Sequence, residues 1–133
     1  MKALDTNILI RFLTADDLKQ YQLVNELFEM AEQNNQTLLI SQLVIIEIFW
    51  VLKTSFKTPR KDIISALDDI LGLEFLFFQS RNTLEQLVKL APEYPSLDLA
   101  DLFIALAAKD LGATSIISFD KKAQAFDFFE ELT

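Results

Sequence analysis

Short apolar runs without polar alternation recur along the chain, and each is followed by a segment whose apolar residues have helical spacing. Uninterrupted apolar runs of this length are typical of strands buried on both faces, as parallel strands are. The alternation predicts an α/β fold, a three-layer sandwich in which a central parallel sheet of four to five short strands is flanked by helices. The predicted strands are Lys2 to Leu4, Thr37 to Ile40, Phe75 to Phe78, Thr114 to Ser118 and, as a fifth, Phe128 to Leu132.

The spacing of apolar residues and the turn-forming residues between them predict the helices. Thr58 and Pro59 are expected to be the N-cap and first residue of one helix, and Gly72 and Gly112 to end two others. Gln42 to Thr54 is apolar on all sides and is expected to be buried, with Trp50 packed in the core rather than stacked on a base. The predicted helices are 5–13, 16–33, 42–54, 59–71, 84–91 ended by Pro92, 97–111 and 121–128.

The 133 residues contain no repeat, low-complexity tract or linker, which predicts one domain over residues 1–133. No run reaches the roughly 18 apolar residues of a membrane span, and the N-terminus has no signal-peptide pattern, so no membrane partner is expected. The chain has no Cys, which excludes disulfides and suits the cytoplasm. It also has no His, which removes the usual general base and zinc ligand, so chemistry at neutral pH must depend on carboxylates, with or without a metal.

Acidic residues interrupt the apolar segments at four places. Asp5 and Asp120 each follow a predicted strand, and ligands in open α/β sheets bind beyond these carboxyl ends. Glu47 interrupts "LVIIEIFWVL", while Asp98 and Asp101 lie about one helical turn apart in "LDLADLFIALAA". A set of carboxylates that converged at this edge of the sheet would form a candidate site.

Capping is a second explanation for some of these acids, because Asp is a favoured N-cap and Asp5, Asp98 and Asp120 each precede a predicted helix. Glu47 does not fit that explanation, since it lies mid-helix with no Lys or Arg three or four positions away. It is therefore expected to be buried without a partner, and a buried acid needs a cation. Converging carboxylates suit a hard divalent ion such as Mg²⁺ or Mn²⁺ and, with it, phosphoryl chemistry.

Four elements in order, "LDTNIL", Glu47 in an apolar helix, "DLADLFIALAAKDLGA" and "ISFDKKA", resemble the PIN-domain ribonucleases, and most of all the VapC-type toxins of type II toxin–antitoxin systems. The resemblance runs from about residue 2 to residue 123. It implies an endoribonuclease that depends on Mg²⁺ or Mn²⁺, is often a homodimer, and is inhibited by a cognate antitoxin protein. The implied catalytic and metal-binding residues are Asp5, Glu47, Asp101 and Asp120, with Asp98 as a second-tier ligand.

The resemblance also places Asn7 and Ser118 at the substrate pocket, although capping or a turn explains both equally well. Ser41 matches a small hydroxyl residue at the end of the second strand, where a plain strand-end Ser is the simpler explanation. The net charge of −8 argues against a passive nucleic-acid binder. Basic residues nonetheless cluster within nine positions and are candidate phosphate contacts, the alternative being a solvated surface; they are Lys53, Lys57, Arg60 and Lys61, with Arg11 as a weaker candidate.

Two alternative functions remain open from the sequence. One is a related nuclease that acts on DNA or structured nucleic acid, which the short chain disfavours because it leaves no room for an added arch or clamp. The other is a catalytically silent PIN-like scaffold that binds a protein partner through its acidic pocket. Retention of all four acids disfavours the scaffold, since a scaffold has no use for carboxylates that repel one another.

Overall fold

The computed structural model describes all residues from Met1 to Thr133. It divides into two compact units, Met1–Arg81 and Asn82–Thr133, and each is described by itself. Helices alternate with strands, and every strand pair is parallel. The predicted α/β class and the parallel pairing are therefore confirmed.

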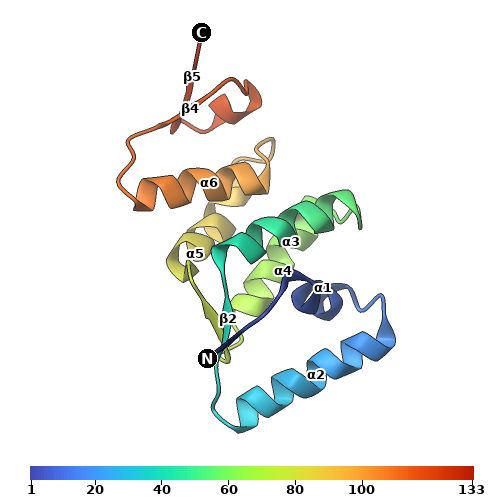
Figure 1. Cartoon of the computed structure of the whole chain (residues 1–133). Coiled ribbons are helices and arrows are strands. Elements are labelled where there is room, and N and C mark those ends of the chain that lie inside the picture. Colours follow the sequence, from blue (N-terminus) through green and yellow to red (C-terminus); the bar gives the residue numbers. More distant parts are fainter. The chain divides into compact units, whose positions relative to one another are not determined.

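The first unit contains a three-stranded sheet in the order β1-β2-β3, with two helices in each connection (Figure 1). Lys2 pairs with Leu38, and Leu38 pairs in turn with Leu76, so β2 is the central strand. Parallel neighbours need such long crossovers, because a tight turn can join only antiparallel strands. The elements are β1 (Lys2–Ala3), α1 (Thr6–Thr14), α2 (Leu18–Gln33), β2 (Leu38–Ile40), α3 (Gln42–Thr54), α4 (Arg60–Leu71) and β3 (Leu76–Phe78).

The core of the first unit includes the contact between α1 and α3. Leu9 of α1, Ile45 of α3 and Ile70 of α4 are each almost completely buried. An aromatic chain extends this core, because the ring of Phe28 lies 4.9 Å from the ring of Phe12 and 5.0 Å from that of Phe75. These contacts fix α1, and with it the segment that carries Asp5.

The second unit contains two strands, β4 and β5, which pair in parallel with Ile116 opposite Phe129. The pairing confirms the predicted fifth strand. The hydroxyl of Thr83 donates a hydrogen bond to the carboxylate of Asp110 and so links two helices of the unit. The elements are α5 (Arg81–Leu90), the 3₁₀ helix η1 (Ala91–Glu93), α6 (Leu99–Asp110), β4 (Ile116–Ser118), the 3₁₀ helix η2 (Lys122–Ala125) and β5 (Phe129–Glu131).

Several helix ends differ from the sequence predictions. Helix α4 begins at Arg60 and Pro59 is its N-cap, so the prediction of Thr58 as N-cap is wrong. The segment predicted as helix 121–128 forms only the short 3₁₀ helix η2. Gly72 is the C-cap of α4 as expected, and Gly112 follows the C-cap of α6 with a φ of +97°, a conformation that glycine adopts without strain.

Helix α3 is the largest departure from the prediction, because it is not buried on all sides. Leu43 is 76% exposed and Trp50 is 64% exposed. Glu47 lies on the same exposed face, while Ile45 and Ile48 point to the core. The expected burial of Trp50 and of Glu47 is therefore wrong.

None of the helices in the structure combines the length and the apolarity that crossing a lipid bilayer requires.

Candidate active site

Asp5 lies two residues beyond β1, at the carboxyl edge of the three-stranded sheet. It is the N-cap of α1, and its Oδ1 accepts a hydrogen bond of 2.7 Å from the backbone N–H of Thr6. The side chain of Asp5 is otherwise exposed, as is that of Asn7 in the first turn of the helix. The hydroxyl of Thr6 is buried without a hydrogen-bond partner. Asp5 therefore caps α1, as one of its two sequence explanations held, and still presents a carboxylate to solvent.

Polar groups also follow the two neighbouring strands of this sheet. Ser41 is the N-cap of α3 and accepts a hydrogen bond from the backbone N–H of Val44. Beyond β3, Oε1 of Gln79 accepts a hydrogen bond of 2.8 Å from the backbone N–H of Gln42. The carboxyl edge of the sheet is thus lined by hydroxyl, amide and carboxylate groups, at the edge where α/β sheets bind ligands.

Glu47 lies on α3, and its side chain is exposed. An exposed carboxylate keeps its hydration, so its charge needs no cation to be tolerated. The burial argument that singled out Glu47 in the sequence therefore fails. The side chain remains accessible to a ligand.

In the second unit, Asp98 is the N-cap of α6. Its Oδ1 accepts hydrogen bonds from the backbone N–H of Ala100 at 2.9 Å and of Asp101 at 3.4 Å. Asp101 follows in the first turn of the same helix and is half-buried. Both carboxylates lie at the positive end of the helix dipole, which favours negative charge. The capping explanation of Asp98 is confirmed.

Asp120 follows β4 and is also exposed. Its Oδ1 accepts a hydrogen bond of 2.9 Å from the backbone N–H of Lys122, and its own N–H donates to Oγ of Ser118 at 3.0 Å. These two bonds form a compact polar turn at the carboxyl end of β4. Ser118 therefore acts as a turn residue here, as its alternative explanation held.

The predicted acidic set is shared between the units: Asp5 and Glu47 belong to the first, and Asp98, Asp101 and Asp120 to the second. Within neither unit do three acidic side chains lie close enough to hold a metal ion. The convergence of the acids stays a prediction. The donor chemistry itself fits a hard divalent ion, because every candidate ligand is a carboxylate and the chain has neither His nor Cys.

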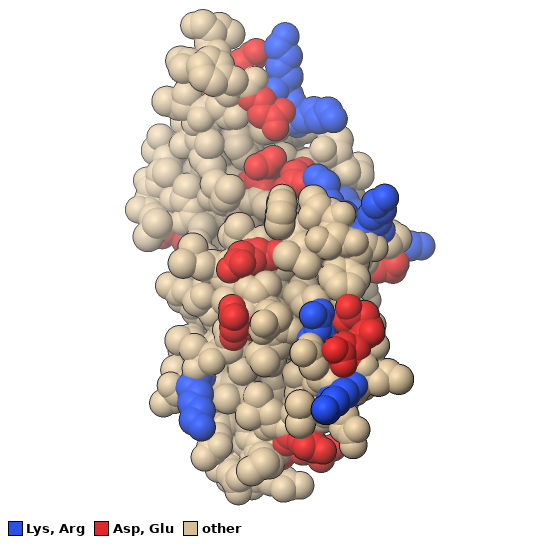
Figure 2. Space-filling model, turned by 45° about the vertical axis from the view of Figure 1, so that its right-hand side comes forward, with Lys and Arg blue, Asp and Glu red and all other residues tan.

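Basic residues occupy the end of α3, the connection that follows it and the start of α4. Lys53 lies in the last turn of α3, and Arg60 and Lys61 begin α4. Lys57, between the helices, is exposed and has a φ of +50°. Figure 2 shows acidic and basic side chains interspersed on the face drawn, without one broad basic area.

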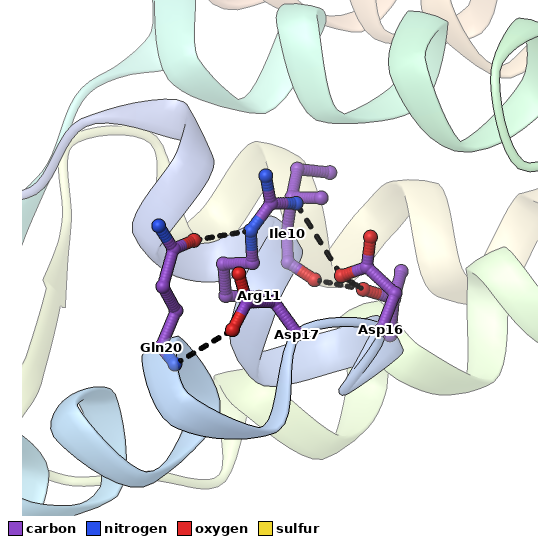
Figure 3. A network of polar contacts seen from close by, with 6 residues as sticks. Ile10, Arg11, Asp16, Asp17 and Gln20 are labelled. Carbon is purple, nitrogen blue, oxygen red and sulfur yellow. Dashed lines mark hydrogen bonds and ion pairs between the residues drawn. The ribbon is translucent and has the colours of Figure 1, made fainter.

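Arg11 has a structural role instead. Its Nε donates a hydrogen bond of 2.6 Å to Oε1 of Gln20, and its Nη1 forms an ion pair of 3.3 Å with Asp16 (Figure 3). Asp17 caps α2 beside it by accepting a hydrogen bond from the backbone N–H of Gln20. Arg11 thereby joins α1 to the start of α2, which accounts for it without any RNA contact.

Comparison with known proteins identifies the family. The sequence model of the PIN domain matches residues 2–129, and thus nearly the whole chain. The chain belongs to the PIN-domain family. This PIN domain is also similar to a VapC ribonuclease of Aquifex aeolicus (strain VF5), with 27% identity over 128 residues that cover 96% of this chain and 93% of the relative. The resemblance found in the four sequence elements is confirmed.

The sequence reasoning missed the exposed position of Trp50 beside Glu47. A helical projection contains the signal, because Leu43, Glu47 and Trp50 recur at spacings of four and three and so share one face. Glu47 carries the only charge among the inner turns of this helix, and a charge normally marks the solvent side. The apolar residues beside it on that face were the unusual feature.

Proposed function

We propose that this PIN-domain protein is an endoribonuclease that depends on Mg²⁺ or Mn²⁺ and is the toxin of a VapC-type toxin–antitoxin pair. The observation that carries the proposal is the family match over residues 2–129, together with acids at the carboxyl ends of β1 and β4 and on α3 and α6. The similarity to a VapC ribonuclease over almost the full length of both chains supports the same activity.

Asp5 and Asp101 would be the principal metal ligands, and Glu47 and Asp120 would complete the set, with Asp98 in a second tier. A divalent ion held by carboxylates activates water and stabilises the charge that develops on a phosphodiester during hydrolysis. The chain's own contribution is orientation. Backbone N–H groups hold the carboxylates of Asp5 and Asp120, and such charge-assisted bonds restrict their rotamers before any ligand arrives.

Substrate contacts would come from polar and basic side chains outside the acidic set. Asn7 and Ser118 lie next to or near the acids in sequence, and they would contact RNA beside the scissile bond. Cations neutralise phosphates and fix the register of a nucleic acid without reading its sequence. The proposed phosphate contacts are Lys53, Lys57, Arg60 and Lys61.

The partners follow from the same proposal. A toxin ribonuclease would be inhibited by a cognate antitoxin protein, and it would act on RNA in the cytoplasm. A second copy of the chain would complete a homodimer. Co-expression with the product of an adjacent small gene, followed by copurification and inhibition of cleavage, tests the antitoxin; sedimentation of the isolated chain tests the dimer.

The activity is tested by incubating the protein with single-stranded RNA in Mn²⁺ and in EDTA, for the parent and for Asp5→Asn. Asn caps a helix about as well as Asp, so the variant should keep its fold. A neutral amide is a poor ligand for Mn²⁺, so the variant should lose most cleavage. Glu29→Gln, an exposed acid on α2, is the matched control and should stay active. Cleavage that persists in EDTA, or in Asp5→Asn, would contradict the proposal.

The same assay separates the alternatives. Cleavage of single-stranded DNA or of structured substrates in preference to single-stranded RNA would favour the related nuclease. A parent protein that binds Mn²⁺ but cleaves no nucleic acid would favour the scaffold.

A further inference from the structure

Trp50 is the single tryptophan of the chain and is 64% exposed on α3. Leu43, two turns earlier on the same face, is 76% exposed. A tryptophan side chain contributes a large apolar area that proteins normally bury, either in a core or against a ligand. The face of α3 that carries Trp50 therefore lacks the packing that such a residue usually has.

The residues around Trp50 indicate the chemistry of the missing partner. Glu47, a proposed metal ligand, precedes Trp50 by three positions, which places their Cβ atoms about 5–6 Å apart on a helix. Lys53 follows Trp50 by three positions, and the exposed Lys57 lies just beyond the helix. An aromatic side chain flanked by cations is the combination that binds single-stranded nucleic acid, since bases stack on the ring and phosphates meet the charges.

The acid on this face argues against a second copy of the chain as the partner. An apolar interface that covered both Leu43 and Trp50 would also cover Glu47, which lies between them in sequence and on the same face. Removing that carboxylate from water without a partner is costly. A base stacked on the indole covers only the ring and leaves the carboxylate hydrated.

We propose that Trp50 stacks on an unpaired base of the RNA next to the scissile phosphate, and that this contact makes the enzyme select single-stranded substrate. The inference rests on the proposed ribonuclease function and deepens it. A paired base inside a duplex has no free face for the indole, because its neighbours in the helix already cover both sides. The cations beyond Trp50 would hold the phosphates that follow that base.

Because Trp50 is the only tryptophan, its fluorescence reports the contact directly. The probe is a short single-stranded oligoadenylate, titrated into the full chain in Ca²⁺, an ion that also takes carboxylate ligands. Stacking of the adenine should quench the emission, whereas the same strand annealed to its complement should not. In the same buffer, Trp50→Ala should raise the dissociation constant for the single strand, measured by fluorescence anisotropy, about 5- to 100-fold. Trp50→Phe, which keeps a ring, should restore most of the affinity.

Leu43→Ala is the matched control, because it truncates an equally exposed apolar residue on the same face. Its affinity for the oligoadenylate should equal that of the parent. An unchanged affinity in Trp50→Ala, or an equal loss in Leu43→Ala, would overturn the proposal. Sedimentation that shows both variants to be monomers and the parent to be a dimer would likewise overturn it and assign this face to a second copy.

Kinetic measurements distinguish failure of the stacking proposal from failure of the proposed ribonuclease function. If the parent cleaves single-stranded RNA in Mn²⁺ and Trp50→Ala does so with the same KM, stacking is wrong while the ribonuclease assignment stands. If the parent neither cleaves RNA nor shows quenching with the oligoadenylate, both are wrong. A raised KM with kcat little changed in Trp50→Ala is the result expected.

Discussion

The carboxylate of Asp98 and the backbone N–H of Ala100 are joined by a hydrogen bond of 2.9 Å that caps α6. Asn caps helices as well as Asp does, so Asp98→Asn should leave the free energy of unfolding almost unchanged. Asp98→Ala removes the cap and should cost about 1 kcal/mol. Urea denaturation of the two variants measures the difference.

Cleavage by Asp98→Asn then separates capping from metal binding, because only the charge is lost. Because Asp98 is proposed only as a second-tier ligand, Asp98→Asn should reduce RNA cleavage less than Asp101→Asn does. Full activity in Asp98→Asn would reduce Asp98 to a cap alone.

Glu47→Gln tests the accessible carboxylate of α3. Surface substitutions away from packed features change the free energy of unfolding by about 0.5 kcal/mol or less, so the fold should be unaffected. Metal-dependent cleavage should nevertheless be largely lost, since the amide is a poor ligand for a hard divalent ion. Urea denaturation and the RNA assay together check this, with Glu29→Gln as the control. A variant with parental activity would remove Glu47 from the ligand set.

Removal of metal should lower the melting temperature. A divalent ion present at about 100 times its Kd stabilises the protein that binds it by about 2.7 kcal/mol, which for a chain of this size corresponds to roughly 10 °C. Calorimetry in EDTA and in Mn²⁺ or Mg²⁺ measures the shift, and Asp101→Asn should show little of it. Identical melting temperatures with and without either ion would exclude the metal site.

The double variant Lys57→Gln, Lys61→Gln tests the cations between α3 and α4. If both contact phosphates, RNA binding should weaken and the slope of log affinity against log salt should fall by about 1 to 2. The control is Lys19→Gln, Lys89→Gln, which removes two exposed cations elsewhere. An unaltered salt slope would show that Lys57 and Lys61 do not contact phosphates and are ordinary solvated side chains.

Gly112→Ala tests a backbone constraint rather than a contact. The φ of +97° disfavours any residue with a Cβ, although no atom beyond the adjoining residues lies within 4 Å of the position that the added Cβ would take. The variant should therefore lose about 1 kcal/mol of stability through strain alone. Gly72→Ala is the comparison without a positive φ, because Gly72 has a φ of −79°, and its added Cβ would instead lie 3.3 Å from the carbonyl oxygen of Asp69. Equal melting temperatures for Gly112→Ala and the parent would contradict the expected backbone strain at this position.

Much of the fold could be predicted because its signals are local. Gly112 follows a helix end in a left-handed conformation, and Asp5 and Asp98 cap helices by hydrogen bonding, so each acts through neighbours in sequence. The strands were recognisable because an uninterrupted apolar run such as 37–40 suits a strand covered on both faces. One local signal was misleading. Thr58 and Pro59 predicted a helix whose first residue is Pro59, but α4 begins one residue later, at Arg60.

The candidate site was harder to predict because the exposure of a side chain depends on tertiary packing and not only on its neighbours in sequence. Glu47 marks one face of α3 as the solvent side, whereas the apolar residues Leu43 and Trp50 on that face favour burial, so the two signals of this helix give opposite predictions. The role of Arg11 depends on Gln20, which reaches it because α2 packs against α1. Whether the acids of α3 and α6 share a metal depends on tertiary contacts that no sequence spacing encodes.

The pairing of β1 with β2 has a consequence for the order in which the protein is made. Lys2 and Ala3 pair only with Leu38 and Leu39 in this sheet, so the strand that leads to Asp5 finds its partner only after α1 and α2 have been synthesised. The central strand β2 gains its second neighbour later still, when β3 appears. Pairings between distant segments form late because the closure of long loops comes first. During synthesis, Asp5 therefore acquires its position at the edge of this sheet only after the chain as far as Leu39 has been made.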